Sequence, residues 1–219
     1  DELAHIISPD RLLSLFAQIC LKEHPQKEIV FDVKCSQMVA ETVQKLHGQA
    51  KMIRTGSSFL RAYLSQSKGN AVFGGEYAGH YVFNDGRGFG YDDGLYAALR
   101  VMEYLTQSDE ANLSALLEIY PERYCTEDTY ISTHDINPKQ VLNDIEIQSH
   151  RLGARLSKID GVRLDFDDGF GIIRASNTGE YFTVRFDADN PSRLSEIRQE
   201  FVSMMQEQYP QIAQELAQA

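Results

Sequence analysis

The five residues Ile29-Val30-Phe31-Asp32-Val33, read as IVFDV, decide the fold class of this chain. Apolar residues follow one another here almost without interruption. A strand with one solvated face alternates apolar and polar residues, whereas a strand buried on both faces reads as a nearly continuous apolar run. The stretch therefore predicts a central strand of a largely parallel sheet that helices cover on both sides.

The flanking segments alternate between helix and strand. Ser8-Pro9 predicts a helix start, because serine caps helices and proline suits the first helical position. Ser36 predicts a second helix start, and further short apolar runs lie at 51–53, 71–73 and 81–83. This rhythm predicts an α/β fold over residues 1–108, with three α/β/α layers around a mixed sheet.

The rhythm changes after a predicted linker at 109–126. Pro138 and Pro191 each open a helical pattern, and alternating strand-like runs lie between them at 162–166, 171–174 and 182–186. Asp167-Asp168-Gly169 is a hairpin turn signal. Residues 127–219 are therefore predicted to form a smaller α+β domain with an antiparallel sheet.

Composition and net charge argue against some kinds of binding partner and favour one cellular compartment. The net charge of −11 argues against nucleic acid or an anionic membrane as a main partner. Cys20, Cys35 and Cys125 form no C-x-x-C pair, which favours reduced thiols in a cytoplasmic protein over disulfides or a zinc site. No segment is apolar for long enough to span a membrane. Because the chain begins at Asp1 without methionine, we expect a processed or truncated product.

The stretch from Phe73 to Phe83, FGGEYAGHYVF, sets an acid and an imidazole among three glycines. Glycines let a ligand approach the backbone closely. The Glu76 carboxylate can accept hydrogen bonds from sugar hydroxyls, and His80 can donate one or move a proton. The alternative is a plain hairpin with incidental polar residues, and this stretch alone leaves both open. Further metal ligands are absent at a fitting spacing.

A second polar turn follows the run at 171–174. Arg174-Ala175-Ser176-Asn177-Thr178-Gly179 gathers a guanidinium, two hydroxyls, an amide and a glycine, which suits a phosphate group. The alternative is a solvated turn, because the same residue types dominate turns. Arg185, on the next run, adds a second cation or makes a surface ion pair.

Three weaker signals lie in the first half. Lys34 and Arg54 each follow a predicted strand, so we expect them to converge with Glu76 at one edge of the sheet. Arg11 lies in the first turn of a helix, where the macrodipole disfavours a cation, and an anionic ligand would explain it. Asp93 is interpreted as the cap of the helix that follows it.

Together these motifs resemble the α-D-phosphohexomutase family, and most closely its bacterial phosphomannomutase/phosphoglucomutase branch. Gly75–His80 resembles the sugar-recognition loop G-E-x-S-G-H of the third domain, and Arg174–Thr178 resembles the phosphate loop R-x-S-N-T of the fourth. PDRLL at 9–13, FDVKC at 31–35 and DDGLYAA at 92–98 also read like their counterparts.

The chain departs from the family pattern at several positions. Ala78 stands where the sugar loop usually has serine, and Ser57 stands where this branch often has histidine. Gly179-Glu180-Tyr181 replaces the usual Glu-Pro or Thr-Pro. The phosphoserine of the first domain and the D-G-D-x-D metal loop of the second have no counterpart in the sequence. The resemblance thus implies the C-terminal half of such an enzyme, domains three and four.

For the complete enzyme, the resemblance implies phosphoryl exchange between hexose 1-phosphate and 6-phosphate through a bisphosphate, with Mg²⁺ held outside this chain. This half would bind substrate and would be inactive alone, with no catalytic residue of its own. It implies substrate-binding positions at Arg11, Lys34, Ser57, Glu76, Ala78 and His80, and phosphate-binding positions at Arg174, Ala175, Ser176, Asn177, Thr178 and Arg185. We expect a monomer that joins N-terminal domains of the same protein. The alternatives are a stand-alone phosphosugar-binding module or degenerate paralogue, and two soluble domains without a ligand.

Overall fold

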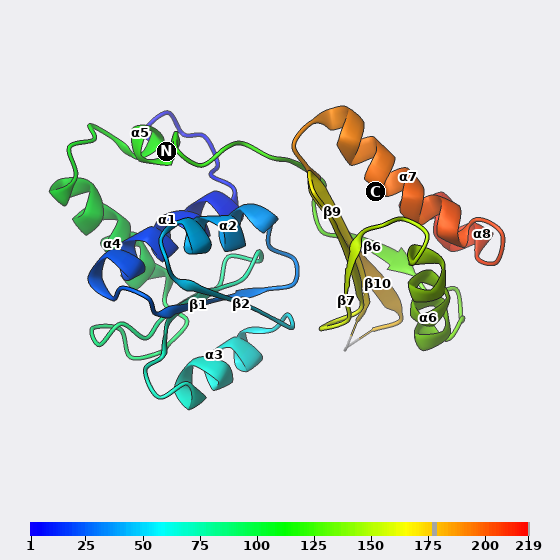
Figure 1. Ribbon diagram of the computed structural model, residues 1–219, viewed down its shortest axis with the longest axis horizontal. Coiled ribbons are helices and arrows are strands. Elements are labelled where there is room, and N and C mark those ends of the chain that lie inside the picture. The colour runs from blue at the N-terminus through cyan, green and yellow to red at the C-terminus, as the bar shows by residue number, and fades with distance from the viewer. Residues whose placement is uncertain (177–178, 219) are drawn as a thin grey trace. The chain divides into compact units, whose positions relative to one another are not determined.

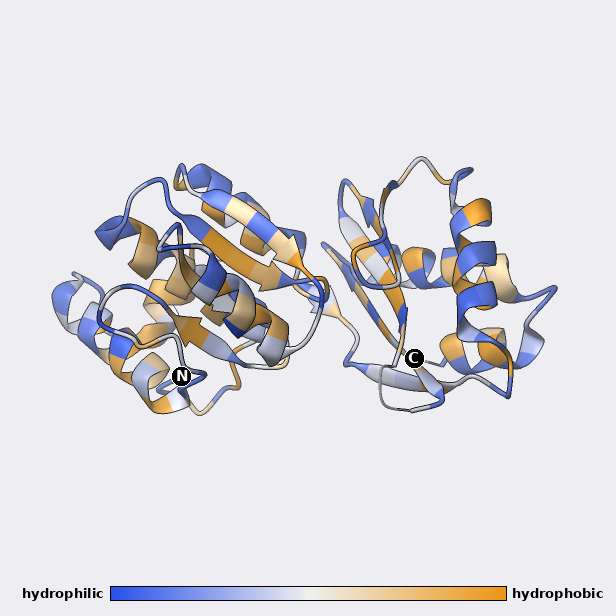
Figure 2. Cartoon of the chain, turned by 90° about the horizontal axis from the view of Figure 1, so that it is seen from below, coloured by the Kyte–Doolittle hydropathy of each residue, from blue (hydrophilic) through white to orange (hydrophobic). Residues whose placement is uncertain are grey.

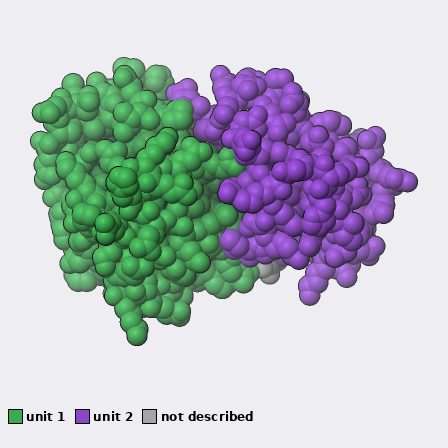
Figure 3. All heavy atoms as spheres, in the orientation of Figure 1, with its two compact units in different colours: residues 1–121 green, residues 122–219 purple. Residues whose placement is uncertain are grey.

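The computed structural model describes residues 1–176 and 179–218. The chain divides into two compact units, Asp1–Pro121 and Glu122–Ala219, which Figure 3 shows in different colours. The division falls inside the segment 109–126 that we predicted as the linker. Part of that segment packs into each unit: Leu117 and Tyr120 join the core of unit 1, and Tyr124–Cys125 forms a strand in unit 2.

Unit 1, described throughout, is built on a four-stranded mixed sheet in the order β2-β1-β3-β4. Strand β1 pairs in parallel with β2 and with β3, and β4 pairs antiparallel with β3. The central position of β1 confirms the prediction from the IVFDV stretch. The strands are β1 (Glu28–Asp32), β2 (Gln49–Ile53), β3 (Ala71–Gly75) and β4 (Tyr81–Phe83).

Helices cover both faces of this sheet, with α1 and α2 on one side and α3 on the other (Figure 1). Val30 of β1 packs in a cluster with Leu60 and Leu64 of α3, whereas Ile29 and Phe31 pack in the cluster that contains α1. This confirms the three-layer prediction. The helices of unit 1 are α1 (Pro9–Glu23), α2 (Gln37–Lys45), α3 (Ser57–Gln66), α4 (Gly94–Gln107) and α5 (Leu113–Leu117).

The predicted caps set where these helices begin. Ser8 accepts a hydrogen bond from the Arg11 N–H, Ser36 from Met38 and Asp93 from Tyr96. The connections from β1 to α2 and from β2 to α3 are consequently short. Residues 33–36 and 54–56 are therefore held at the carboxyl ends of the parallel strands.

The described part of unit 2 contains an antiparallel sheet in the order β5-β10-β9-β8-β7, with β6 also paired to β10. This confirms the predicted antiparallel sheet. Its strands are β5 (Tyr124–Cys125), β6 (Thr129–Ser132), β7 (Arg155–Ser157), β8 (Val162–Phe166), β9 (Gly169–Ala175) and β10 (Tyr181–Ala188). The helices that follow or separate them are α6 (Pro138–Ser149), α7 (Pro191–Met205) and α8 (Pro210–Leu216).

The two faces of this sheet differ in chemistry. Phe182, Val184 and Phe186 of β10 pack with residues of the three helices in one core cluster. Thr183 and Arg185 alternate with them, so they lie on the opposite face. Figure 2 shows the same alternation of hydrophobic and hydrophilic residues along the strands of unit 2. One face is thus the core, and the other carries charged side chains.

A glycine lets the loop before β8 lie directly on β9. Gly161 has a φ of +81°, and a Cβ added there would lie 2.3 Å from the Ile173 carbonyl oxygen. Gly153 has a φ of +67°, but an added Cβ would meet no described atom within 4 Å. The two glycines share a left-handed backbone and differ in available space.

Gly161→Ala should therefore destabilise unit 2 more than Gly153→Ala in urea unfolding. An alanine in the left-handed region costs about 1–2 kcal/mol at either position. At Gly161 the steric overlap adds about 1–3 kcal/mol, the usual range for overpacking. Equal losses for the two variants would contradict this account.

Candidate functional site

The carboxylate of Asp32 ties together the ends of the three parallel strands. Asp32 is the last residue of β1 and is fully buried. One of its oxygens accepts a hydrogen bond from the Thr55 hydroxyl after β2 at 2.8 Å, and the other accepts the Tyr77 N–H after β3 at 3.0 Å. The Cys35 S–H donates to it at 3.1 Å. Sequence reasoning missed Asp32, although an acid at the end of an apolar strand was a signal.

Glu76 directly precedes Tyr77 in the chain, and one of its carboxylate oxygens has no partner among the described residues. Only 2% of the residue is exposed. Its Oε1 accepts the Gly56 N–H at 2.5 Å. Its buried Oε2 accepts no hydrogen bond from any residue that the structure describes. A buried acceptor that forms no hydrogen bond costs free energy, so this oxygen indicates a place where a donor from a ligand could bind.

The surroundings of Glu76 favour its protonated form. Burial is the largest cause that raises the pKa of its carboxyl, and the negative charge of Asp32 adds to the effect. The Gly56 hydrogen bond and the positive potentials of His80 and Lys34 act in the opposite direction but do not offset burial. A perturbed carboxyl at the carboxyl end of a parallel sheet marks a candidate site.

The turn from Glu76 to His80 places the imidazole beside an acid. Gly79 has a φ of +86° and donates its N–H to the Glu76 carbonyl, and the Glu76 N–H donates to the His80 carbonyl. The exposed His80 ring lies with Nδ1 2.5 Å from the Asp92 carboxylate. Because a carboxylate only accepts, Nδ1 carries the proton and Nε2 is left for another group. Sequence reasoning missed Asp92, whose neighbour Asp93 caps α4 as predicted.

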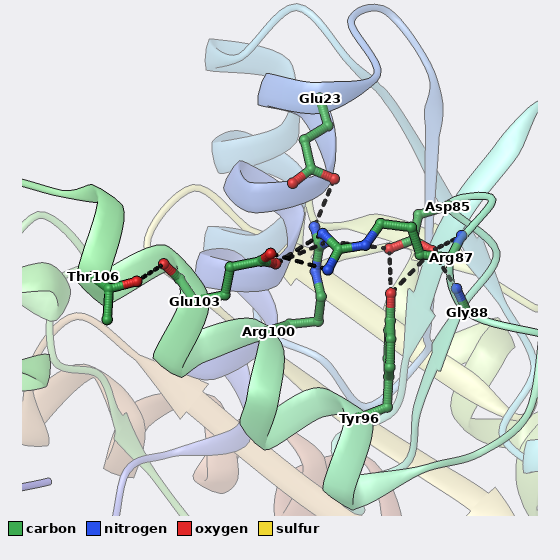
Figure 4. Close-up of polar contacts among 8 residues, drawn as sticks. All are labelled: Glu23, Asp85, Arg87, Gly88, Tyr96, Arg100, Glu103 and Thr106. Carbon is green, nitrogen blue, oxygen red and sulfur yellow. Dashed lines mark hydrogen bonds and ion pairs between the residues drawn. The ribbon is translucent and has the colours of Figure 1, made fainter.

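A buried ion network fixes the loop that delivers Asp92. Arg100 of α4 is 1% exposed, and its guanidinium contacts Glu23 of α1 at 2.7 Å and Glu103 at 3.4 Å (Figure 4). It also lies 3.7 Å from Asp85, which follows β4. The network thereby joins the loop after β4 to two helices of unit 1.

Asp85 organises that loop through its hydrogen bonds. It accepts the N–H groups of Arg87 and Gly88 and the Tyr96 hydroxyl. Burial opposes ionisation, but these donors and Arg100 together lower the pKa of Asp85. Asp85 is therefore a fully used structural carboxylate, and the loop it shapes ends at Asp92, whose backbone bridges Val82 of β4.

The structure brings only some of the predicted cations to this edge. Lys34 is buried, and its Nζ lies 5.8 Å from the centroid of the Tyr77 ring, next to Glu76 in the chain. Arg54 stacks on Phe59 at 4.1 Å instead. Arg11 donates to the Leu117 carbonyl at 2.8 Å, so part of its guanidinium is bound at the end of α5.

The remaining predicted positions of unit 1 follow from the backbone. Ser57 is the first residue of α3 and follows Gly56, the donor to Glu76. Ala78 is exposed in the turn between Glu76 and His80. Ala78 therefore lies two residues from the candidate carboxylate in the chain, and Ser57 lies next to the residue that donates to it.

In unit 2 the predicted phosphate turn follows β9. The Arg174 guanidinium donates from Nε to Asp160 at 2.9 Å and from Nη1 to the Thr183 hydroxyl at 3.2 Å. Gly161 allows this approach, since it lets the loop that carries Asp160 lie on β9. Sequence reasoning missed Asp160, although the aspartate before a glycine was a turn signal.

The other members of the predicted phosphate set divide between the turn and the sheet. Ser176 accepts the Gly179 N–H at 3.1 Å, and its own N–H donates to Tyr181. Ala175 ends β9, whereas Asn177 and Thr178 lie outside the described residues. Arg185 lies on the same sheet face as Arg174, fully buried and 3.7 Å from Asp187, so its ion pair is not a surface one.

Within residues 1–176 and 179–218, no group of three or more His, Cys, Asp or Glu side chains is placed to hold a metal ion. No helix in these ranges combines the length and apolarity that a membrane crossing requires.

Comparison with known proteins identifies the family. Residues 8–124 match the family model described as phosphoglucomutase/phosphomannomutase, alpha/beta/alpha domain III, and residues 136–204 match the C-terminal domain of the same family. A phosphomannomutase/phosphoglucomutase of Pseudomonas syringae pv. tomato is 35% identical over 95% of this chain and 44% of its own length. A phosphoglucomutase of Neisseria gonorrhoeae is 38% identical over 92% of this chain and 43% of its own length.

A solved structure agrees with these relatives. The crystal structure of a phosphoglucomutase/phosphomannomutase family protein from Burkholderia thailandensis aligns with a TM-score of 0.83 at 34% identity, covering 92% of this chain and 42% of that one. The chain thus spans less than half the length of these relatives. The chain belongs to the phosphoglucomutase/phosphomannomutase family and corresponds to its domains III and IV.

Proposed function

We propose that this chain is the substrate-binding half of a phosphohexomutase that interconverts hexose 1-phosphate and hexose 6-phosphate through a bisphosphate. The observation that carries the proposal is the buried Glu76 carboxylate, whose Oε2 has no described donor. A sugar hydroxyl supplies such a donor. The position of Glu76 after β3, at the carboxyl end of a parallel strand, is also where α/β folds bind ligands.

His80 and Lys34 complete the proposed sugar site of unit 1. With Nδ1 held by Asp92, Nε2 of His80 can accept a hydroxyl proton or, when protonated, donate a hydrogen bond. Lys34 supplies positive charge near Glu76, in an otherwise acidic protein. Ser57, Ala78 and Arg11 remain proposed substrate positions by resemblance to the family.

We propose that the phosphate group binds at the turn after β9 in unit 2. Asp160 and Thr183 set the plane of the Arg174 guanidinium, so this cation is already oriented. An oriented guanidinium suits the fixed geometry of phosphate oxygens. Ala175, Ser176, Asn177, Thr178 and Arg185 form the rest of the proposed set.

The chemical step itself is assigned to protein outside this chain. Phosphoryl transfer depends on a donor and on compensation of developing negative charge, which Mg²⁺ supplies when bound. The described residues offer no cluster for that ion. We therefore propose that Mg²⁺ and the phosphoserine donor belong to N-terminal domains of the same protein, a cytoplasmic monomer, and that this chain alone has no turnover.

A stand-alone phosphosugar-binding module is the second candidate. Ala78 and Ser57 favour it, because both replace side chains that the family usually presents to substrate. A complete coding sequence with phosphoserine and D-G-D-x-D motifs upstream would support the mutase, and one that begins at this chain would support the module.

The proposed binding predicts an affinity that depends on the geometry of Arg174. In titration calorimetry the chain should bind mannose 1-phosphate and glucose 6-phosphate, and Arg174→Lys should weaken binding by about tenfold or more, as expected when a charge-assisted hydrogen bond is lost. Arg151→Lys, at an exposed position in the turn after α6, is the matched control. Unchanged affinity in Arg174→Lys, or no binding by the chain, would contradict the proposal.

Glu76→Gln should stabilise unit 1 at neutral pH while it weakens phosphosugar binding. The raised pKa of Glu76 means that the folded state holds its proton more tightly than the unfolded state, so the wild type loses stability as pH rises above 4.5. Glutamine removes this loss. The advantage of the variant in urea unfolding should therefore grow from acid to neutral pH and then level off.

Glu103→Gln is a control for which we expect a change in stability of the opposite sign. The Arg87 hydrogen bond lowers the pKa of the half-buried Glu103, so this variant should lose stability slightly at neutral pH. An advantage of Glu76→Gln that does not change with pH would contradict the assigned buried charge.

Asp92→Asn should change which ring nitrogen of His80 carries the proton. At alkaline pH, nitrogen NMR of the wild-type chain should show the His80 proton on Nδ1, because Asp92 accepts it there. The variant should shift the proton toward Nε2 and weaken sugar phosphate binding. Asp93→Asn keeps the cap of α4 and should leave the His80 signals unchanged. A wild-type ring with its proton on Nε2 would refute this role.

A further inference from the structure

Strand β6 lies beside the part of β10 that returns from the proposed phosphate turn. Residues 129–132 of β6 pair antiparallel with residues 181–184 of β10. Thr183, whose hydroxyl accepts a hydrogen bond from Arg174, lies opposite Tyr130 in this pairing. The turn has little rigidity of its own, because residues 175–180 include a glycine and no proline. Its geometry therefore depends on contacts with neighbouring elements of unit 2.

Thr133, directly after β6, contacts the end of this turn. Thr133 is 3% exposed, and both its N–H and its hydroxyl donate to the Glu180 carbonyl oxygen, at 3.1 and 3.2 Å. At the start of the turn the Ser176 N–H donates to the Tyr181 carbonyl, and the Ser176 hydroxyl accepts the Gly179 N–H. A carbonyl oxygen has two lone pairs, and one residue supplies donors to both here, so Thr133 fixes the direction of this carbonyl.

An aromatic contact from β6 supports the same turn. The Tyr181 ring lies against Gly179, where an added Cβ would be 2.5 Å from the ring atom Cε1. The Tyr130 ring of β6 meets the Tyr181 ring edge-on, with the two centroids 5.3 Å apart. Strand β6 and the residue after it therefore support the turn by hydrogen bonds and, through Tyr181, by aromatic packing.

Glu215 of α8 holds this end of β6. Its carboxylate accepts the Ser132 N–H at 3.1 Å and lies 2.6 Å from Nε2 of His134. The macrodipole disfavours an acid in the last turn of a helix, so these contacts offset an unfavourable position. Ser132 and His134 flank Thr133 in the chain. The helix α8 thus determines where Thr133 lies.

The backbone directly after Thr133 has an unusual conformation. His134 and Asp135 have φ values of +49° and +60°, in the left-handed region that residues other than glycine rarely adopt. Such a conformation persists where surrounding contacts determine it, and it is enriched at functional sites. Here the Ile136 N–H donates back to the Thr133 carbonyl at 2.9 Å, and Glu215 contacts the His134 ring.

We propose that Thr133 is a positioning residue for the proposed phosphate turn, and that Glu215 acts on the turn through Thr133. The Thr133 side chain is buried and donates to the Glu180 carbonyl, so it acts on the protein backbone and not on the ligand. This inference rests on the proposed phosphate binding, because it concerns the affinity of the same turn. It adds a helix at the C-terminal end of the described chain to the residues that set that affinity.

Calorimetric titration with mannose 1-phosphate tests the role of the Thr133 hydroxyl. Thr133→Val removes this donor and nearly keeps the shape of the side chain, and should weaken binding about threefold to tenfold, the usual effect of one hydrogen bond. Thr133→Ser keeps the donor and should bind like the wild type. Glu215→Ala should also weaken binding, whereas Gln214→Ala, at the exposed preceding position of α8, should not.

NMR of the ligand-free chain separates positioning from a general loss of folding. Thr133→Val and Glu215→Ala should shift the amide signals of Ser176 and Gly179, because the hydrogen bonds of the turn change. The amide signal of Leu164, in the core on β8, should stay in place. Gln214→Ala should leave all three signals unchanged.

Each other outcome counts against a defined part of the account. Wild-type binding that Thr133→Val leaves unchanged would overturn this inference alone, as would unshifted Ser176 and Gly179 signals in both variants. Weakened binding that Thr133→Ser does not restore, or that comes with a shifted Leu164 signal, would show a loss of packing and overturn the positioning role. A wild-type chain that binds no sugar phosphate would overturn the proposed function, and this inference with it.

Discussion

The candidate site of unit 1 depends on one buried carboxylate, that of Asp32. It accepts hydrogen bonds from Thr55 and Tyr77, which follow the two strands that flank β1. The carboxyl ends of three strands are thereby held in register by a single side chain. Tyr77 directly follows Glu76, so this tie also fixes where the candidate ligand carboxylate begins its turn. A preorganised site requires such supporting contacts, since a loosely held carboxylate would lose much of its binding geometry.

Local patterns in the sequence predicted the helices, strands and turns but not the side-chain contacts between residues far apart in the chain. The IVFDV run, the caps at Ser8 and Ser36, and the polar turn at 76–80 each reflect chemistry within a few residues. Asp32 reads in that run as a mere interruption, because its partner Tyr77 lies 45 residues away. Asp92 and Asp160 were missed for the same reason. Their roles depend on tertiary distances to His80 and Arg174 that no periodicity records.

The cations show a different limit of sequence reasoning. The chain holds 32 acidic and 21 basic residues, so a carboxylate within the protein is available to most arginines. Arg185 accordingly contacts Asp187, and Arg174 contacts Asp160. Arg54, which follows β2, lies over the Phe59 ring instead. A cation after a strand therefore indicates a ligand site only weakly in an acidic protein. Its internal partners decide whether it is free to bind or is already oriented by a neighbour.

Two buried carboxylates of unit 1 differ in how far their hydrogen-bonding capacity is used. Glu76 and Asp85 are 2% and 5% exposed, and burial alone would raise the pKa of each carboxyl. Asp85 receives two backbone N–H groups, a tyrosine hydroxyl and a nearby guanidinium, and its pKa falls below the usual value. Glu76 receives one backbone N–H, and its pKa rises. The two groups are similarly buried but differ in their hydrogen bonds. The Asp85 carboxylate finds its donors within unit 1 and holds a loop in place, whereas Oε2 of Glu76 accepts none from the described residues, which makes Glu76 the candidate ligand group.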